Sequence, residues 1–365
     1  MKRLNMRTLS LLTAVGLLCV GGWNVASAQD AQPVRVTVDN FCRAESDTYF
    51  ARFVSEGGFG KLHHERELAA IDKQTVIRLN RDTLYSFGVF DLEAAPVAVM
   101  LPDADKRYLA VQVINEDHYT TDVAYAPATI TLTKEHVGTR YVCLAIRTFV
   151  NPDDADDVKA VHALQDAIEV RQSAAGEFET TNWDQASLKK VREALLGVVT
   201  ANGEMDSSRM FGAKNDVDPV EHLLGTAAGW GGNPRNTALY MGTVPKENDG
   251  QTAYQLTLKD VPVDGFWSVS VYDKEGFFQK NAENRYTVNN VTAKKNPDGS
   301  VTISFGGDKR RSQLHPDHAG LELPHPALPP APGSSRRHLE GPGSRTGRQM
   351  NGAGNRCSTV PSCLP

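Results

Sequence analysis

The sequence predicts a mainly β fold of the α+β class, in which two β-rich domains are joined by a helical connector. Short runs rich in Val, Ile, Thr and aromatic residues alternate with turn residues before residue 150 and again after residue 252. Between residues 151 and 230 the apolar residues follow a helical period instead. With 365 residues, 40% of them hydrophobic, the chain is long enough to bury a core in each domain.

Residues 1–28 have the three parts of a secretory signal peptide. Met1 to Arg7 is basic, Leu11 to Val20 is largely apolar, and Ala26-Ser27-Ala28 supplies small residues for cleavage before Gln29. No later segment reaches the roughly 18 apolar residues that a bilayer span requires. We therefore expect a periplasmic protein that has no stable membrane insertion once the signal peptide is removed.

Residues 29–150 are expected to form one helix and then the first β domain. Asp39 can cap a helix that carries Phe41, Tyr49 and Phe53 on one side and ends at Gly57-Gly58. Six strands follow in this prediction: Thr75–Leu79, Thr83–Phe90, Val97–Leu101, Tyr108–Ile114, Thr129–Thr133 and Thr139–Ile146.

Residues 151–234 form the predicted connector, because each expected helix begins with its own start signal. Asn151-Pro152, Asp184 and Asp218-Pro219 each precede apolar residues at helical spacing. Strand patterns return in residues 235–308, the second β domain. There the turn Asn296-Pro297-Asp298-Gly299 is expected to join the last two strands in a hairpin.

Residues 309–365 differ from everything before them. They contain no Phe, Trp, Tyr or Ile, but nine of the 19 prolines. Such a segment cannot bury enough apolar area to offset its conformational entropy, so disorder is predicted.

Net charge excludes one class of function. The whole chain carries −5, while residues 1–28 carry +3 and residues 309–365 carry +5, so the body between them carries −13. Phosphate neutralisation needs clustered Lys and Arg, and we therefore expect no nucleic-acid partner.

Cys42 and Cys143 are the two cysteines of the β-rich body. In an oxidising compartment they could form a disulfide, or they could be two separately buried thiols. Spacing alone does not choose between these alternatives.

Two groups of motifs resemble a pair of bacterial families. The run Val76 to Ser86 (VIRLNRDTLYS), with Asp91-Leu92, Pro96-Val97, Leu101-Pro102 and Arg107-Tyr108 after it, resembles domain of unknown function 1254. The second group resembles domain of unknown function 1214 and comprises Asp264 to Ser268 (DGFWS), Gly276-Phe277, Asn284 to Tyr286 (NRY) and Asn296 to Ser300 (NPDGS). This resemblance implies two jelly-roll-like β-sandwiches with helices between them, in an exported or envelope protein, and no established activity.

The end of the chain departs from the second family, which the resemblance expects to continue into a closing strand. Back-translating Arg311 to Gly341 and reading one base later can give a segment that contains WNYLTRLYRPR, followed by the family's terminal pattern. The tail from about Lys309 therefore looks like a frameshift product.

Asn80-Arg81-Asp82 and the nearby Tyr85 are the first candidate ligand residues, because a polar loop at the end of a sandwich can place Arg as an anion clamp and Asp as a base. The alternative is a structural pair that only fixes the local turn. Glu116 and His118, with Tyr119 beside them, are the second candidates, since two residues that are two apart on a strand share a face and could act as acid and base. A solvated turn is the alternative.

Trp230 and Asn233 are the third candidates, on a Gly-rich loop that could offer an aromatic platform to a sugar or another flat ligand. A helix end with a core tryptophan is the alternative. Motifs of serine hydrolases, P-loop NTPases and zincins are missing, and no metal or cofactor is predicted.

Binding of a small molecule or glycan is therefore the leading functional hypothesis. A hydrolase or lyase that uses Glu116, His118 and the Asn80-Arg81-Asp82 loop is the alternative, and an envelope assembly protein with homo-oligomer contacts is a third. Both loops sit at strand ends of the same sandwich, and loops at one end converge, so we predict that Asn80, Arg81, Asp82 and Tyr85 line one cleft with at least one of Glu116, His118 or Tyr119.

Overall fold

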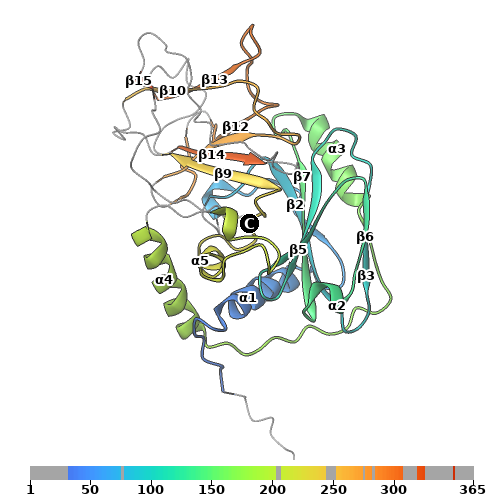
Figure 1. The fold of residues 1–365 in the computed structure, drawn as a ribbon. Helices are drawn as coiled ribbons and strands as arrows, with labels where there is room; N and C mark the ends of the chain where they lie inside the picture. The colour runs from blue at the N-terminus through green and yellow to red at the C-terminus, as the bar shows by residue number, and fades with distance from the viewer. Residues whose placement is uncertain are drawn as a thin grey trace, which may run out of the picture.

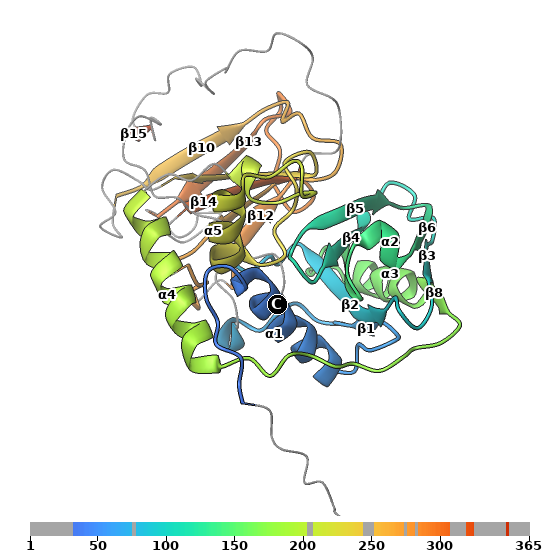
Figure 2. The same cartoon turned by 60° about the horizontal axis from the view of Figure 1, so that its bottom comes forward.

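The fold consists of two β-sandwiches that lie side by side, with helices against the N-terminal one (Figures 1 and 2). This computed structural model describes residues 32–74, 78–202, 207–243, 252–273, 276–281, 284–306, 319–324 and 348–349. The β-rich α+β class predicted from the sequence is confirmed. Among the described residues, no helix combines the length and the apolar character needed to cross a bilayer.

The N-terminal sandwich has a five-stranded and a three-stranded sheet, both antiparallel. In spatial order the larger sheet comprises β1 (His63–His64), β2 (Thr83–Asp91), β7 (Tyr141–Phe149), β4 (Leu109–Asn115) and β5 (Thr120–Tyr125). The smaller comprises β6 (Ala128–Leu132), β3 (Val97–Leu101) and β8 (Glu169–Gln172). Val111 and Ile146 of the larger sheet share one buried core with Val97 and Val99 of the smaller one. In β3, buried and half-exposed positions alternate, so a one-residue slip would turn Val97 and Val99 out of this core, and their burial fixes the register.

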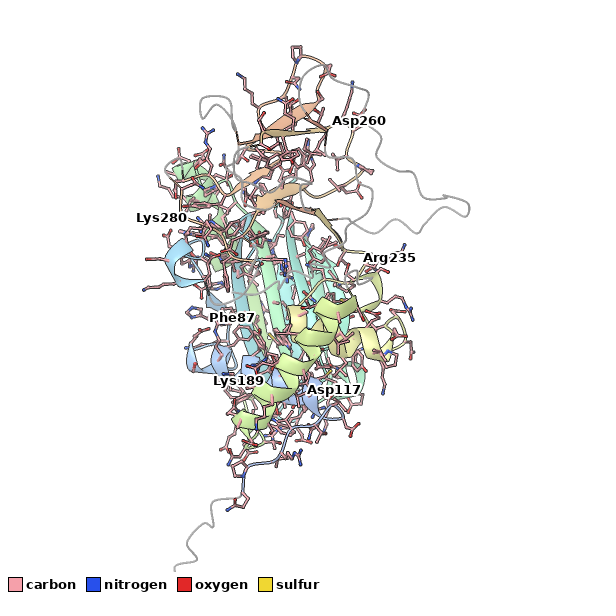
Figure 3. The ribbon with its side chains drawn as sticks, turned by 90° about the vertical axis from the view of Figure 1, so that its left-hand side faces the viewer. Phe87, Asp117, Lys189, Arg235, Asp260 and Lys280 are labelled. Carbon is pink, nitrogen blue, oxygen red and sulfur yellow. The ribbon has the colours of Figure 1, made fainter. Side chains whose placement is uncertain are left out.

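The opposite face of the larger sheet packs against helix α1 (Phe41–Ser55). The rings of Phe53 and Phe87 lie 4.4 Å apart between their centroids, and Figure 3 labels Phe87 on this sheet. The helix begins at Phe41, and its N-cap is Asn40 and not the predicted Asp39. The Asn40 side chain makes no capping hydrogen bond and accepts one from Thr37 N, at 2.8 Å, instead.

The connector contains α3 (Ala155–Asp166), α4 (Gln185–Asn202) and α5 (Pro219–Gly229), with the 3-10 turn Ser207–Arg209 between α4 and α5. The 3-10 turn Ile71–Lys73 and the short α2 (Lys134–Val137) lie earlier in the chain. Asp218 accepts hydrogen bonds from Val220 N and Glu221 N, so this predicted cap is confirmed. The first predicted start, Asn151-Pro152, is wrong by three residues, because the Asp154 side chain is the acceptor that caps α3.

The C-terminal sandwich also has two sheets. One comprises β12 (Thr287–Asn289), β11 (Ser268–Val271), β14 (Ala319–Pro324) and β9 (Ala238–Thr243), and the other β13 (Val301–Phe305), β10 (Tyr254–Leu258) and β15 (Arg348–Gln349). The predicted hairpin is wrong in its strand partners: β12 pairs with β11 and β13 pairs with β10. The turn itself is formed: Gly299 adopts the left-handed φ of +82°, and Lys295 and Val301 make an isolated antiparallel bridge across it. The chain passes from one sheet to the other before this turn, between β12 and Lys295.

β14 belongs to the tail for which the sequence predicts disorder. It pairs antiparallel with β11 on one side and with β9 on the other, so the prediction of disorder is wrong for residues 319–324. The strand is accommodated because its only proline, Pro324, stands at its last position. The predicted strand Thr75–Leu79 falls largely outside the described residues.

Candidate functional site

The Asn80-Arg81-Asp82 loop joins the two sandwiches. Asn80 Oδ1 accepts a hydrogen bond from Asp82 N at 2.6 Å, which closes a tight turn before β2. Asp82 is 1% exposed, and its Oδ1 accepts a hydrogen bond from Asn289 Nδ2 of β12 at 2.8 Å. The Arg81 guanidinium lies 5.5 Å from the centroid of the Tyr286 ring and donates to the carbonyl oxygen of Ala69. The motifs that resemble the two families therefore meet in one interface.

Electrostatics favour a structural role for this loop. Burial raises the pKa of Asp82 to about 6, although hydrogen bonding by Asn289 and Ser268 and the charge of Arg81 lower it in part. The Ser268 hydroxyl lies beside the carboxyl group, but no hydrogen bond of ordinary geometry reaches Asp82 Oδ2. The structural alternative foreseen from the sequence accounts for the observed contacts.

Glu116 follows β4 and is 7% exposed. Its Oε2 accepts a hydrogen bond from Tyr141 N at 2.9 Å, and its Oε1 lies 3.7 Å from the Arg43 guanidinium. Burial raises its pKa, which the backbone hydrogen bond and Arg43 oppose. Arg43 also pairs with Asp117 at 2.7 Å. Glu116 thus holds β7 and α1 together rather than standing in a solvated turn.

His118 is 2% exposed and adopts a left-handed φ of +66°. Its Nε2 accepts a hydrogen bond from Gly231 N at 2.7 Å, so in the neutral ring Nδ1 carries the proton and donates to Thr226 Oγ1 at 2.8 Å. Burial, with the neighbouring His222, holds the pKa of His118 well below its ordinary value. Both ring nitrogens are engaged within the protein, which leaves neither available for acid–base chemistry.

Five rings form a continuous column between α1 and the loop after β4. Centroid distances are 4.4 Å from Tyr119 to His222, 5.4 Å from His222 to His118, 5.3 Å from His118 to Trp230 and 4.3 Å from Trp230 to Tyr49. Trp230 is 1% exposed and donates from Nε1 to Ser46 Oγ at 3.0 Å. It is a core tryptophan, not an exposed platform for a ligand.

The composite cleft predicted from the two loops is wrong. β2 and β4 both pair antiparallel with β7, so they run parallel to each other, and Asp82 precedes β2 whereas Glu116 follows β4. The two loops are therefore at opposite ends of the sheet, about 26 Å apart at ~3.3 Å per residue over the length of β2. Figure 3 shows Asp117 in the lower half and Lys280, near the Asp82 end, in the upper half.

Cys42 and Cys143 are free thiols, so the disulfide is not formed. Cys42 Sγ lies 3.4 Å from Thr226 Oγ1 of α5, whereas Cys143 is fully buried in β7 among the aromatic residues of the α1 interface. The alternative of two separate thiols describes the structure.

A different polar cluster lies on the α1-facing side of the sheet, and the sequence analysis did not identify its centre. Arg147 of β7 is 4% exposed and donates to Gln112 Oε1 at 2.8 Å, to Asn233 Oδ1 at 3.3 Å and to Gly231 O at 3.1 Å. Its guanidinium also lies 5.5 Å from the centroid of the Tyr85 ring. Two of the predicted candidates, Tyr85 and Asn233, therefore meet around Arg147.

Tyr125 of β5 completes what we call the Arg147 cluster: Tyr85, Gln112, Tyr125, Arg147 and Asn233. Ala110 of β4 pairs with Tyr125 of β5 on one side and with Arg147 of β7 on the other, so Tyr125 and Arg147 lie on the same face of the sheet. Burial raises the pKa of the Tyr125 phenol, and the positive charge of Arg147 lowers it in part. Its hydroxyl is buried and has no hydrogen-bond partner within the described part of the chain.

The surroundings of the cluster include the C-terminal sandwich. Tyr108 packs edge-on against Tyr125 and against Phe266 of the DGFWS motif, with centroids 5.9 and 5.3 Å apart. Asn233 donates to the hydroxyl of Tyr240 in β9 at 2.7 Å. Tyr108, Tyr125, Asn233 and Tyr240 are half-buried, whereas Arg147 and Gln112 are buried. In the cluster the buried Arg147 guanidinium is thus accompanied by half-buried aromatic and amide side chains, which we call its rim: Tyr108, Tyr125, Asn233 and Tyr240.

One signal in the sequence points to this cluster. Arg147 is the only charged residue of β7 and Gln112 is one of two polar residues of β4, in strands that otherwise are largely apolar. A charged residue inside a buried strand needs hydrogen-bond partners that offset the free-energy cost of its desolvation. Because charged residues are seldom buried, such a residue is a candidate for a functional role.

No metal site accompanies the cluster in the part of the chain that the structure describes, where His, Cys, Asp and Glu do not assemble in groups of three that could hold a metal ion.

Two family models match the chain. Residues 59–136 match a protein of unknown function (DUF1254), and residues 239–319 match a protein of unknown function (DUF1214). These matches confirm the paired resemblance, in the expected order. No curated protein matches the chain.

Two solved structures resemble the chain. The crystal structure of the VPA0106 protein from Vibrio parahaemolyticus is 18% identical with a TM-score of 0.57, and the match covers 80% of this chain and 93% of that one. A putative uncharacterized protein from Burkholderia cenocepacia is 12% identical with a TM-score of 0.45, covering 80% of this chain and 84% of that chain. The likeness to the Vibrio parahaemolyticus protein supports the fold and nothing about function.

Proposed function

We propose that this chain, which carries a DUF1254 domain followed by a DUF1214 domain, is a periplasmic protein that binds a small polar molecule or a glycan at the Arg147 cluster. The observation that carries the proposal is the buried, unpartnered hydroxyl of Tyr125 beside the buried Arg147 guanidinium. Buried polar groups in native proteins nearly always have a partner, so an orphaned hydroxyl beside a cation suggests that a bound group supplies one.

The chemistry of the rim suits a polyhydroxylated or carboxylated ligand. Tyrosine rings offer apolar faces with a polar edge. The Arg147 guanidinium offers donors to hydroxyl or carboxylate oxygens, and the Asn233 amide offers both donors and an acceptor. The cluster also lies where the two sandwiches meet, a common position for ligand sites.

Binding is favoured over the hydrolase or lyase alternative. His118 is neutral and bonded through both nitrogens, and Glu116 is bonded to β7 and paired with Arg43. Acid–base catalysis by this pair would require these contacts to break.

Native mass spectrometry of the protein released from the periplasm tests the proposal. We expect an added mass on the wild type, or a complex with one member of a panel of neutral and carboxylated saccharides. Tyr125→Phe removes one hydrogen bond and should weaken binding about tenfold. Tyr119→Phe, at the opposite end of the sheet, is the matched control and should bind normally. Binding that is unaffected by Tyr125→Phe would contradict the proposed site.

A further inference from the structure

The interface between the two sandwiches is held by a small set of polar contacts around the Asn80-Arg81-Asp82 loop. The Gln74 side-chain amide bonds to both the N–H and the carbonyl of Phe278, each at 2.8 Å. The hydroxyl of Tyr272 donates to Leu79 O at 3.1 Å, and Arg78 N donates to Gly276 O at 2.6 Å. All of these contacts are neutral, so none of them responds to mild changes of pH.

Asp82 is the exception at this interface. Its carboxyl group is fully enclosed between the start of β2 and strands β11 and β12, where Asn289 donates to Oδ1 and Oδ2 has no hydrogen-bond partner within the described residues. The adjacent Arg81 guanidinium is directed to Ala69 O and the Tyr286 ring. An ionised carboxylate in this position has the Asn289 amide and the nearby Ser268 hydroxyl around it. These two groups replace little of the hydration free energy that the carboxylate loses on burial.

We propose that Asp82 is a pH-sensitive latch, which holds the two sandwiches together more tightly when its carboxyl group is protonated. The neutral form keeps the Asn289 bond at Oδ1 and can donate its own proton from Oδ2 to the Ser268 oxygen, which satisfies both groups. The ionised form gains hydration when the interface opens, and it therefore favours opening.

The groups that face Asp82 define this response. Arg81 is the charged neighbour on its own segment, Ser268 and Asn289 face it from β11 and β12, and Tyr286 lies under Arg81. On β14, Glu322 occupies the register position opposite Ser268. The raised pKa of Asp82, about 6, places its titration in the mildly acidic range.

This inference goes beyond the proposed ligand site and needs no ligand for its test. Hydrogen exchange of the full chain, corrected for the intrinsic pH dependence of exchange, compares residues 82–85 and 287–289 at pH 5 and pH 7.5. A carboxyl group that titrates near 6 when enclosed and near 3.8 when exposed predicts about tenfold lower protection at pH 7.5. Strand β3, away from the interface, serves as the internal reference.

Asp82→Asn should abolish the difference between the two pH values, because its amide keeps the bond with Asn289 and does not titrate. Asp117→Asn, at the other end of the sheet, should leave the difference unchanged. Equal protection of the wild type at both pH values would overturn the latch, and so would an unchanged pH response in Asp82→Asn. Should Asp82→Asn fail to fold, the wild-type comparison with β3 decides the question alone.

Discussion

Asp47 on α1 offers a quantitative test of how burial governs the stability of this fold. Its side chain is almost fully buried; Oδ2 accepts a hydrogen bond from Trp183 Nε1 at 2.7 Å, and Oδ1 has no hydrogen-bond partner among the described residues. The pKa of Asp47 is raised from 3.8 to about 6. Burial is the largest cause and the negative charges of Glu116 and Asp117 contribute, whereas the hydrogen bond from Trp183 and the charge of Arg43 lower the pKa. Ionisation of this carboxylate therefore lowers the free energy of unfolding of the protein.

The magnitude follows from the two pKa values. Each pKa unit corresponds to about 1.4 kcal/mol, so the ionised form costs up to about 3 kcal/mol of unfolding free energy above pH 6. Because the folded state binds the proton more tightly, this cost develops as the pH rises from about 4 to about 6 and then stays constant. Asp47→Asn retains an oxygen for Trp183 and cannot ionise. It should be more stable than the wild type at pH 8, and as stable at pH 4.

Urea unfolding followed by tryptophan fluorescence at pH 8, 6 and 4 measures this difference. Asp157→Asn is a control of opposite sign, because the hydrogen bonds from Arg107 hold the pKa of Asp157 below its usual value. That variant should lose stability at pH 8 and approach the wild type as the pH falls. If Asp47→Asn is less stable than the wild type at pH 8, or if the difference is the same at all three pH values, the reasoning from burial is refuted.

Three further predictions concern the core and both ends of the chain. Trp230→Ala should lower the unfolding free energy by about 3–5 kcal/mol in the same urea assay, because it empties the middle of the ring column; a loss below about 1 kcal/mol would mean that the column is not core. N-terminal sequencing of periplasmic material should begin at Gln29, and an intact Met1 would contradict export. A version whose tail is read in the alternative frame should have a higher thermal midpoint and be more soluble, since the aromatic and branched residues of its WNYLTRLYRPR segment would bury about a few hundred Å² of additional apolar surface, worth several kcal/mol; equal midpoints and equal solubility would count against a frameshift.

The sequence predicts helix caps and strand alternation well in this chain, because both features depend on residues only a few positions apart. The Asp218 cap acts on N–H groups two and three residues away, and the alternating burial of β13 repeats along a single strand. Such features need no knowledge of distant partners. Strand β5 is missed for a related reason: Thr120–Tyr125 is half-buried and has too few apolar residues to show alternation.

The candidate site depends instead on long-range pairing. Whether Asp82 and Glu116 share an end of the sheet is decided by β7, which lies between their strands and makes β2 and β4 parallel. The partners of Arg147 come from β4, β2 and the loop after α5, so no window of sequence contains them. Likewise, the two thiols could be judged only once Cys42 was placed against α5 and Cys143 inside the sheet.

The most direct test of the proposed function is a high-resolution crystal structure of the protein purified gently from the periplasm, with the Arg147 cluster as the region of interest. Binding of a small polar molecule or glycan predicts non-protein density larger than a water molecule within about 3 Å of the Tyr125 hydroxyl, on the side facing Arg147. A single ordered water, or no density at all, in crystals soaked with the saccharides that bind in solution would contradict the site.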